Sequence, residues 1–161
     1  MTQYTQRPSR RTATSPTSSK PSALYRHDAE IALTASILLA PDLLPTVTTI
    51  CTTADIQDPS CRMIYSTATM LDEHGEAVSV NAVVDHLGQC NAILAADVAE
   101  AITDAVPVGC HAVYYGAAVA EAAKRRRIQA TLHEIATANR NGATFAAMTP
   151  MVAALSSEVA L

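Results

Sequence analysis

The sequence predicts an all-α protein in which a small globular head of about five short helices is followed by a protruding antiparallel helical hairpin. Alanine occurs 31 times, and alanine with straight-chain residues dominates residues 110–140; these residues lose little conformational entropy in a helix. Aromatic residues make up only 4%, and few segments alternate as strands do. Residues 110–140 contain no proline, and a second apolar pattern with helical spacing follows them.

The stretch 110–140 is the longest predicted helix. At 1.5 Å per residue it would be about 45 Å long, which exceeds what the core of so small a domain can cover. Such a helix needs a folded-back partner helix or another subunit. Asn141 and Gly142 end it, and a second stripe follows at spacings of three or four. This stripe consists of Phe145, Met148, Val152, Leu155 and Val159. We therefore expect residues 108–161 to form the hairpin.

The chain begins with a segment of different composition. Residues 1–22 are rich in Ser, Thr, Pro and Arg, and they cannot bury enough apolar surface to offset the entropy of ordering. We interpret them as a disordered basic tail. It is either a solvated leader or an electrostatic arm that touches nucleic acid or an acidic partner.

The head is expected to span residues 23–107. Its first helix should run from about Asp28 to Ala40 and stop before Pro41. Asp28 and Glu30 would lie in its first turn, where acidic groups suit the positive end of the helix dipole. Its predicted apolar face consists of Ile31, Ala35, Leu38 and Leu39.

Four further short helices complete the predicted head. One carries the apolar positions of residues 43–51, with Pro45 in its first turn. The next begins at Asp58-Pro59, an N-cap followed by a proline, and ends at Gly75. Ser79 caps a helix that Gly88 should stop, and the last spans about residues 95–106.

Pro150 interrupts the apolar stripe of the second hairpin arm and leaves two interpretations. Either Thr149 caps a helix that begins at Pro150, or a longer helix from Thr144 continues through the proline. We favour the first, because it avoids a proline in a helix interior.

The charge distribution argues against phosphate binding by the folded body. The first 26 residues hold five of the eleven basic side chains and no acid, so the remainder has six basic and fifteen acidic side chains, a net charge of −9. The four cysteines contain no CxxC pair, which fits buried, reduced thiols in a cytoplasmic protein. No apolar run approaches 18 residues, and residues 1–22 are too polar for a signal peptide.

No pattern in the sequence predicts an active site. The phosphate-binding GxxxxGK[ST] motif is missing, as are GxGxxG, HExxH and GxSxG. The five histidines share no metal-ligand spacing, and Cys110 and His111 would point about 100° apart on one helix. We therefore expect no enzyme activity, no metal and no cofactor.

The dense basic run at residues 124–127 has two interpretations. It is either a solvated helix surface, with partners such as Glu121 four residues before Arg125, or two of its arginines reach carboxylates across a subunit interface.

Residues from about 22 to the C-terminus resemble the N-terminal domain of DnaB-family replicative DNA helicases. The resemblance rests on an ordered series of short segments rather than on one motif. They are residues 27–30 (HDAE, similar to an acidic "EAE" turn), 61–65 (CRMIY), 71–79 (LDEHGEAVS), 83–87 (VVDHL), Pro107 with 111–115 (HAVYY), and 121–128 (EAAKRRRI). Cys61 replaces a usual histidine, Ser79 a common aspartate, and the Gly-Gly-x-x-Tyr-Leu segment is missing near residues 91–96.

The resemblance implies a non-catalytic module for DNA replication. In that family, hairpins of neighbouring copies pair, six copies form a collar above the ATPase ring, and the collar engages primase. The chain ends at Leu161, about where the linker to the motor domain would begin, so the collar is expected without the motor.

Three functions stay open at this stage. The first is an assembly module that self-associates and binds primase or full-length helicase. The second is a mimic of the helicase-binding domain of primase, which would occupy helicase. The third is a small nucleic-acid-binding regulator that uses the tail and the run 124–127.

The predicted self-association surface lies along one side of the hairpin, and the same stripe could instead only hold the two arms of one chain together. Its residues are Tyr114, Ala117, Ala118, Glu121, Arg125, Ile128, Leu132 and Ile135 on the first arm, and Phe145, Val152 and Leu155 on the second.

Overall fold

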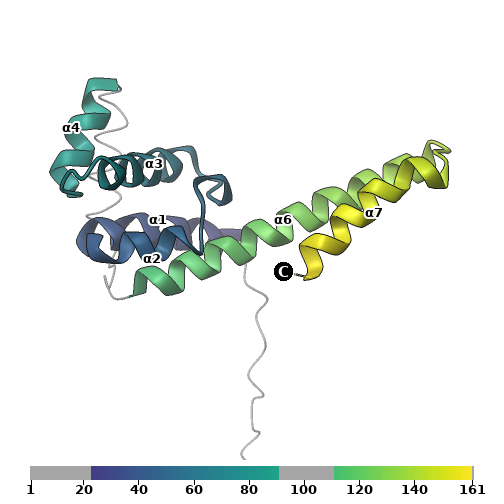
Figure 1. The fold of residues 1–161 in the computed structure, drawn as a ribbon, viewed down its shortest axis with the longest axis horizontal. Coiled ribbons are helices and arrows are strands. Elements are labelled where there is room, and N and C mark those ends of the chain that lie inside the picture. Colours follow the sequence, from purple (N-terminus) through teal and green to yellow (C-terminus); the bar gives the residue numbers. More distant parts are fainter. Residues whose placement is uncertain (1–22, 91–110, 161) are drawn as a thin grey trace, which may run out of the picture.

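The computed structural model describes residues 23–90 and 111–160, and every described element is helical. The predicted all-α fold, with its head and hairpin, is confirmed (Figure 1). The elements are α1 (Ala23–Leu39), η1 (Pro41–Leu43), α2 (Leu44–Thr48), η2 (Thr53–Asp55), α3 (Pro59–Glu73), α4 (Val80–Cys90), α6 (Ala112–Arg140) and α7 (Phe145–Ala160). The predicted tail 1–22 and the predicted helix 95–106 lie outside the described residues.

Helix α1 is the centre of the head. It packs against α3 on one side and against the first half of α6 on the other (Figure 1). All six residues from 33 to 38 are buried, so this part of the helix is enclosed all round. Leu33 and Ile37 are fully buried and are among the largest side chains of the core.

The predicted apolar face of α1 is only partly correct. Ala35 and Leu38 are buried, but Leu39 is 54% exposed and Ile31 is half-buried. The prediction of one apolar face fails here, because a helix that packs against neighbours on two sides has no solvent-exposed face along its middle turns. The helix also begins earlier than predicted, at Ala23, while its end before Pro41 is as predicted.

Glu30 has a different role from the one that its position suggested. The earlier start of α1 moves it out of the first turn, and its side chain is buried. Its two carboxylate oxygens accept hydrogen bonds from the backbone N–H groups of Gln57 (3.0 Å) and Asp58 (2.8 Å). Glu30 therefore stabilises the start of α3 rather than its own helix, and it joins the two helices across the core.

Helix α3 has the predicted start and end. The Asp58 side chain accepts a hydrogen bond from the Cys61 N–H (2.9 Å), and Gly75 follows the helix with a φ of +72°. Tyr65, which is fully buried, donates a hydrogen bond to the carbonyl of Cys51 (2.6 Å). This bond fastens α3 to the segment that follows α2.

Helix α4 begins as predicted but continues further. Ser79 accepts a hydrogen bond from the Ala82 N–H (3.1 Å), in agreement with its predicted cap. The helix runs to Cys90, so the predicted stop at Gly88 is wrong. A glycine costs a helix only about 1 kcal/mol relative to alanine, and the burial of Val83 and Leu87 on the preceding turns holds α4 in place.

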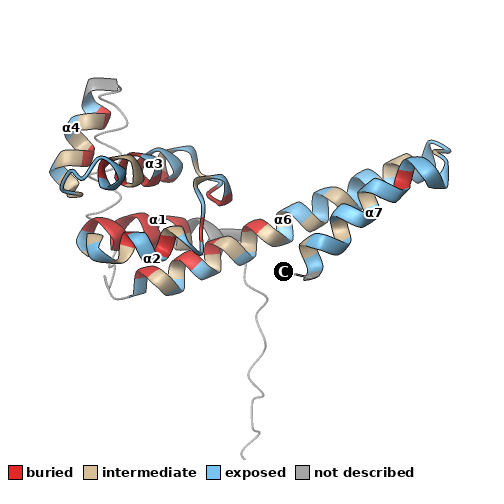
Figure 2. Cartoon of the chain, in the orientation of Figure 1, coloured by how far each residue is buried: buried red, intermediate tan, exposed pale blue. Residues whose placement is uncertain are grey.

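The first half of α6 belongs to the core of the head. Ala112, Gly116, Val119 and Ala123 are buried at spacings of three or four, whereas no residue from 124 to 140 is buried. A Cβ atom at Gly116 would lie 3.2 Å from Cγ1 of Val47, so the absence of a side chain lets α6 approach α2 closely. Figure 2 shows that buried residues are concentrated in the head, whereas exposed residues predominate along the hairpin.

Helix α7 runs antiparallel to the outer half of α6 and contains Pro150 in its interior (Figure 1). The favoured interpretation, a helix that begins at Pro150, is therefore wrong. Thr144, and not Thr149, caps the helix, and the Thr149 hydroxyl instead donates to the carbonyl of Phe145 (2.9 Å). The proline deprives the Ala146 carbonyl of its i+4 donor, but Ala146 is exposed and its carbonyl can be hydrated.

In the described part of the chain, no single helix is long and apolar enough to cross a bilayer. Residues 28–39 and 41–48 meet that criterion only together, and the two segments are bent by 111°.

Replacing Glu30 by Gln should destabilise the head. The substitution removes a buried carboxylate and turns an amide group toward two N–H donors, so we expect the free energy of unfolding to fall by about 1.5–3 kcal/mol. Urea unfolding followed by circular dichroism measures this loss. Asp28→Asn is the matched control on the same helix, because Asp28 is exposed, and it should change stability by less than about 0.5 kcal/mol. Equal effects of the two substitutions would contradict the role of Glu30.

Two glycines on helices should respond in opposite directions. Gly116→Leu would force a side chain against Val47, Cys51 and Leu33, and should cost about 1–3 kcal/mol or more through overpacking. Gly88→Ala places a methyl group in open space and should stabilise α4 by up to about 1 kcal/mol. Thermal unfolding of both variants measures the difference, and a tolerated leucine at 116 would contradict the close packing of α6.

Candidate interaction surface of the hairpin

The two arms of the hairpin enclose an open apolar groove with a volume of about 720 Å³. It follows the outer part of the hairpin, away from the head. Its lining residues are Leu132, Ile135, Ala136, Asn139, Phe145, Met148, Thr149, Val152, Ala153 and Ser156. Most of this surface is hydrocarbon, and its few polar groups are one amide and two hydroxyls.

Large apolar side chains in this groove are exposed to solvent. Leu132 is 49% exposed, Val152 is 48% exposed, and Phe145, the only phenylalanine of the chain, is 89% exposed. Met148 is the one buried residue among those described in α7, so the two arms bury little against each other. A contiguous exposed apolar surface of this kind is typical of a protein interaction site.

The structure gathers four of the eleven predicted surface residues in this groove. Leu132 and Ile135 come from α6, and Phe145 and Val152 from α7. Ile128 and Leu155 are half-buried on the same two helices. Sequence reasoning included Met148 in the stripe but left it out of the surface, although its spacing from Phe145 and Val152 already indicated that it faces α6.

The residues predicted nearer the head lie elsewhere. Tyr114 and Ala118 line a separate pocket of about 230 Å³ against α1, together with Asp28, Ala29, Ala32 and Tyr115. Ala117 is exposed. Glu121 accepts a hydrogen bond from Arg125 (3.0 Å), and both side chains are more than half exposed, as the solvated-helix interpretation predicts. The predicted stripe is therefore interrupted, and only its outer part forms one surface.

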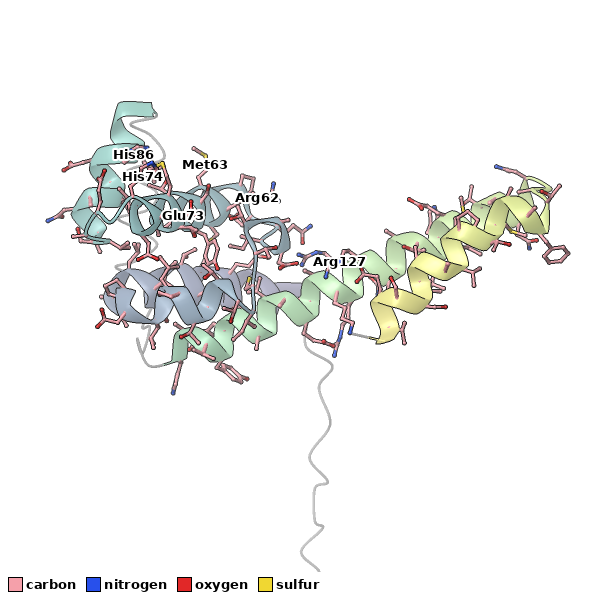
Figure 3. The ribbon with its side chains drawn as sticks, viewed as in Figure 1. Arg62, Met63, Glu73, His74, His86 and Arg127 are labelled. Atoms are coloured by element: carbon pink, nitrogen blue, oxygen red, sulfur yellow. The ribbon has the colours of Figure 1, made fainter. Side chains whose placement is uncertain are left out.

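Two other arginines of the basic run contact the body of their own chain. Arg127 Nη1 donates to Asp55 Oδ1 (2.7 Å), and its Nε donates to Glu158 Oε2 (3.3 Å). Arg126 donates through Nη2 to the backbone carbonyl of Asp55. Figure 3 shows Arg127 on the stretch of α6 between the head and the end of α7. Arg127 therefore reaches two carboxylates, both within its own chain.

Asp55 is the acceptor on which these contacts converge. It is only 6% exposed, and its Oδ2 accepts hydrogen bonds from the backbone N–H and the hydroxyl of Thr52, both at 2.8 Å. Burial alone would raise the pKa of Asp55, but the hydrogen bonds from Thr52 and Arg127 outweigh it and hold this pKa below its ordinary value. Asp55 is therefore ionised at neutral pH.

Two cysteines of the head, Cys51 and Cys61, are buried and form no disulfide. Burial raises the pKa of the Cys51 and Cys61 thiols to about 12, which keeps both protonated and unreactive. Within the described residues, no three side chains of His, Cys, Asp or Glu lie close enough to hold a metal ion together.

These features define a class of protein, an all-α module with a compact head and a projecting hairpin that carries an exposed apolar groove. Residues 22–121 match the family model of the DnaB-like helicase N terminal domain. The chain belongs to that family, and the resemblance in its sequence is confirmed. In this family the domain is the part of the helicase that lacks the motor.

The fold agrees with this assignment. The chain is similar to the crystal structure of the N-terminal domain of DnaB helicase from Mycobacterium tuberculosis, with a TM-score of 0.69 and 23% sequence identity. The similarity covers 88% of this chain and 99% of that one, so it includes most of the hairpin as well as the head. No curated protein matches the chain.

Asp55 should contribute to a pH-dependent part of the stability. Because the folded state lowers the pKa of Asp55 below its ordinary value of 3.8, this contribution is fully present above the ordinary pKa and is lost as the pH falls through the lower folded-state pKa. We expect Asp55→Asn to reduce the free energy of unfolding at neutral pH, and the difference from the wild type to shrink on acidification.

Urea unfolding at several values from about pH 7 to about pH 3 measures this difference. Asp42→Asn, at an exposed position, is the control and should follow the wild type throughout. A constant difference between wild type and Asp55→Asn over the whole range would contradict the lowered pKa.

Proposed function

We propose that this protein is a non-catalytic assembly module of DNA replication that self-associates through the outer part of its hairpin. The single observation that carries the proposal is the exposed apolar groove between α6 and α7, with Leu132, Phe145 and Val152 largely in solvent. A surface of this composition gains free energy when a second apolar surface covers it.

A second copy of the hairpin is the occupant that fits best. Each copy carries both the groove and a protruding aromatic side chain, Phe145, at its rim, and a two-fold interface uses the same patch twice. Aromatic anchors of this kind dominate the energetics of many interfaces. Membership of the DnaB-like N-terminal family supports the same arrangement, because the resemblance to that family implies that hairpins of neighbouring copies pair.

The partners beyond self-association are proposed to be the replicative helicase or primase. The family assignment supports both, and it supports the related possibility of a protein that occupies helicase in place of primase. Pull-down of the purified chain against a replicative helicase and against a primase, each tested separately, distinguishes these partners.

Direct binding of DNA by the head and hairpin has less support. Residues 28–88 carry nine carboxylates and one arginine, so this part of the head repels phosphates. Arg125, Arg126 and Arg127 are engaged with groups of their own chain. The proposed module therefore acts through protein contacts.

Placing a charge in the groove tests the proposed self-association. Leu132→Asp and Val152→Asp should each weaken association by about 2 kcal/mol or more, roughly thirtyfold in dissociation constant, because an interface would bury an unpaired carboxylate. Light scattering and native mass spectrometry over a concentration series to about 100 µM measure the oligomeric state.

The controls lie on the same two helices but outside the groove. Gln129→Asp and Ala154→Asp are at exposed positions and should leave the oligomeric state unchanged. Circular dichroism establishes that all four variants keep their helices. A wild-type chain that stays monomeric at the highest concentration, or groove variants that associate like their controls, would refute the proposed surface.

A further inference from the structure

Asp55 contacts α6 just beyond the part of that helix that is buried in the head. Up to Ala123 the helix is held by burial against α1 and α2, and Arg126 and Arg127 follow one turn later. Beyond these two arginines, α7 is the described helix that packs along α6. The outer hairpin therefore projects from the head beyond residue 127.

The side chain of Arg127 joins three parts of the chain at this point. It belongs to α6, its Nη1 binds Asp55 of η2, and its Nε binds Glu158 near the end of α7. The Asp55 carboxylate is itself fixed by two hydrogen bonds from Thr52, so it is a rigid acceptor. The Arg127 guanidinium thus connects α6, the first arm of the hairpin, to both the head and the second arm.

The same region contains an unsatisfied donor. Arg126 Nη2 reaches the Asp55 carbonyl, but its Nη1 is buried and has no hydrogen-bond partner in the described structure. A buried donor without an acceptor is costly, and a small rotation of α6 would change which acceptors it reaches.

We propose that Asp55, Arg126 and Arg127 form an electrostatic joint that sets the direction in which the hairpin projects from the head. Opening of the joint lets the outer hairpin swing, while the packing of residues 112–123 keeps α6 attached to the head. Arg127 is 49% exposed in its side chain, so salt and competing carboxylates can reach it. The joint lies within one chain and does not depend on self-association.

The distance from the head to the tip of the hairpin tests the joint. Spin labels at Met63→Cys on α3 and Ala146→Cys on α7 occupy exposed positions (Met63 is labelled in Figure 3). Cys90 and Cys110 are replaced by serine, whereas the buried Cys51 and Cys61 stay. Labelled chains are diluted with an excess of unlabelled chains, so that pulsed electron paramagnetic resonance reports distances within one chain.

Arg127→Gln should shift or broaden the distance distribution relative to the wild type. Asn141 in the loop lies fourteen positions after Arg127, a distance of about 20 Å along the helix, so a rotation of about 10° moves the tip by roughly 3–4 Å. Raising the salt concentration should produce a change in the same direction in the wild type and little further change in Arg127→Gln.

Arg125→Gln is the matched control. It removes a neighbouring arginine whose hydrogen bond, to Glu121, lies within α6, and it should leave the distribution unchanged. Asp55→Asn removes the carboxylate from the other side of the contact and should reproduce the effect of Arg127→Gln. A wild-type distribution in both Arg127→Gln and Asp55→Asn, or an equal effect of Arg125→Gln, would overturn the proposal.

Discussion

Head and hairpin share one helix, α6, and the packing of its first half against α1 and α2 is the contact on which the rest of the structure depends. Gly116 allows this contact, because any side chain there would meet Val47 at once. The burial of Ala112, Val119 and Ala123 then fixes α6 in the head without long side chains. Because α6 is anchored in the head over only three turns, its outer half extends into solvent. That half can then pack against α7 and against a further protein surface.

Carboxylates provide the long-range polar contacts of the head. Glu30 of α1 accepts two backbone hydrogen bonds at the start of α3, and Asp55 accepts bonds from its own turn and from Arg127. Both are nearly inaccessible to solvent, yet each is hydrogen-bonded through both oxygens, so the cost of burying the charge is offset. The strongly acidic composition of the head therefore has partly a structural origin, since two of its carboxylates hold elements together rather than face a partner.

The sequence predicted the features that depend on neighbouring residues. Asp58 and Ser79 cap helices, and Gly75 and Gly142 end them with positive φ, because each of these choices is decided within one turn. It failed at Gly88, where burial of the preceding turns outweighs the small cost of a glycine, and where α1 is enclosed on two sides. It also failed at Pro150, because the carbonyl that loses its donor there is exposed and can be hydrated. The contact of Asp55 with Arg127 joins residues 72 positions apart, and no periodicity or spacing rule connects them. The groove was predicted in part, since its stripe is periodic, but the half nearer the head packs against α1 or remains in solvent.

The proposed surface and the proposed joint differ in the force that acts in each, and salt separates them. The groove is hydrocarbon, so association through it should be unaffected or strengthened by salts that favour apolar burial. The joint is a half-exposed ion pair, and screening weakens it. If both proposals hold, a chain at high salt keeps its partner while its head reorients relative to the hairpin. An assembly built from such chains would then retain its hairpin contacts while its heads take different directions. This follows because the apolar groove lies on the outer part of the hairpin, whereas the ion pair of Arg127 lies where α6 leaves the head.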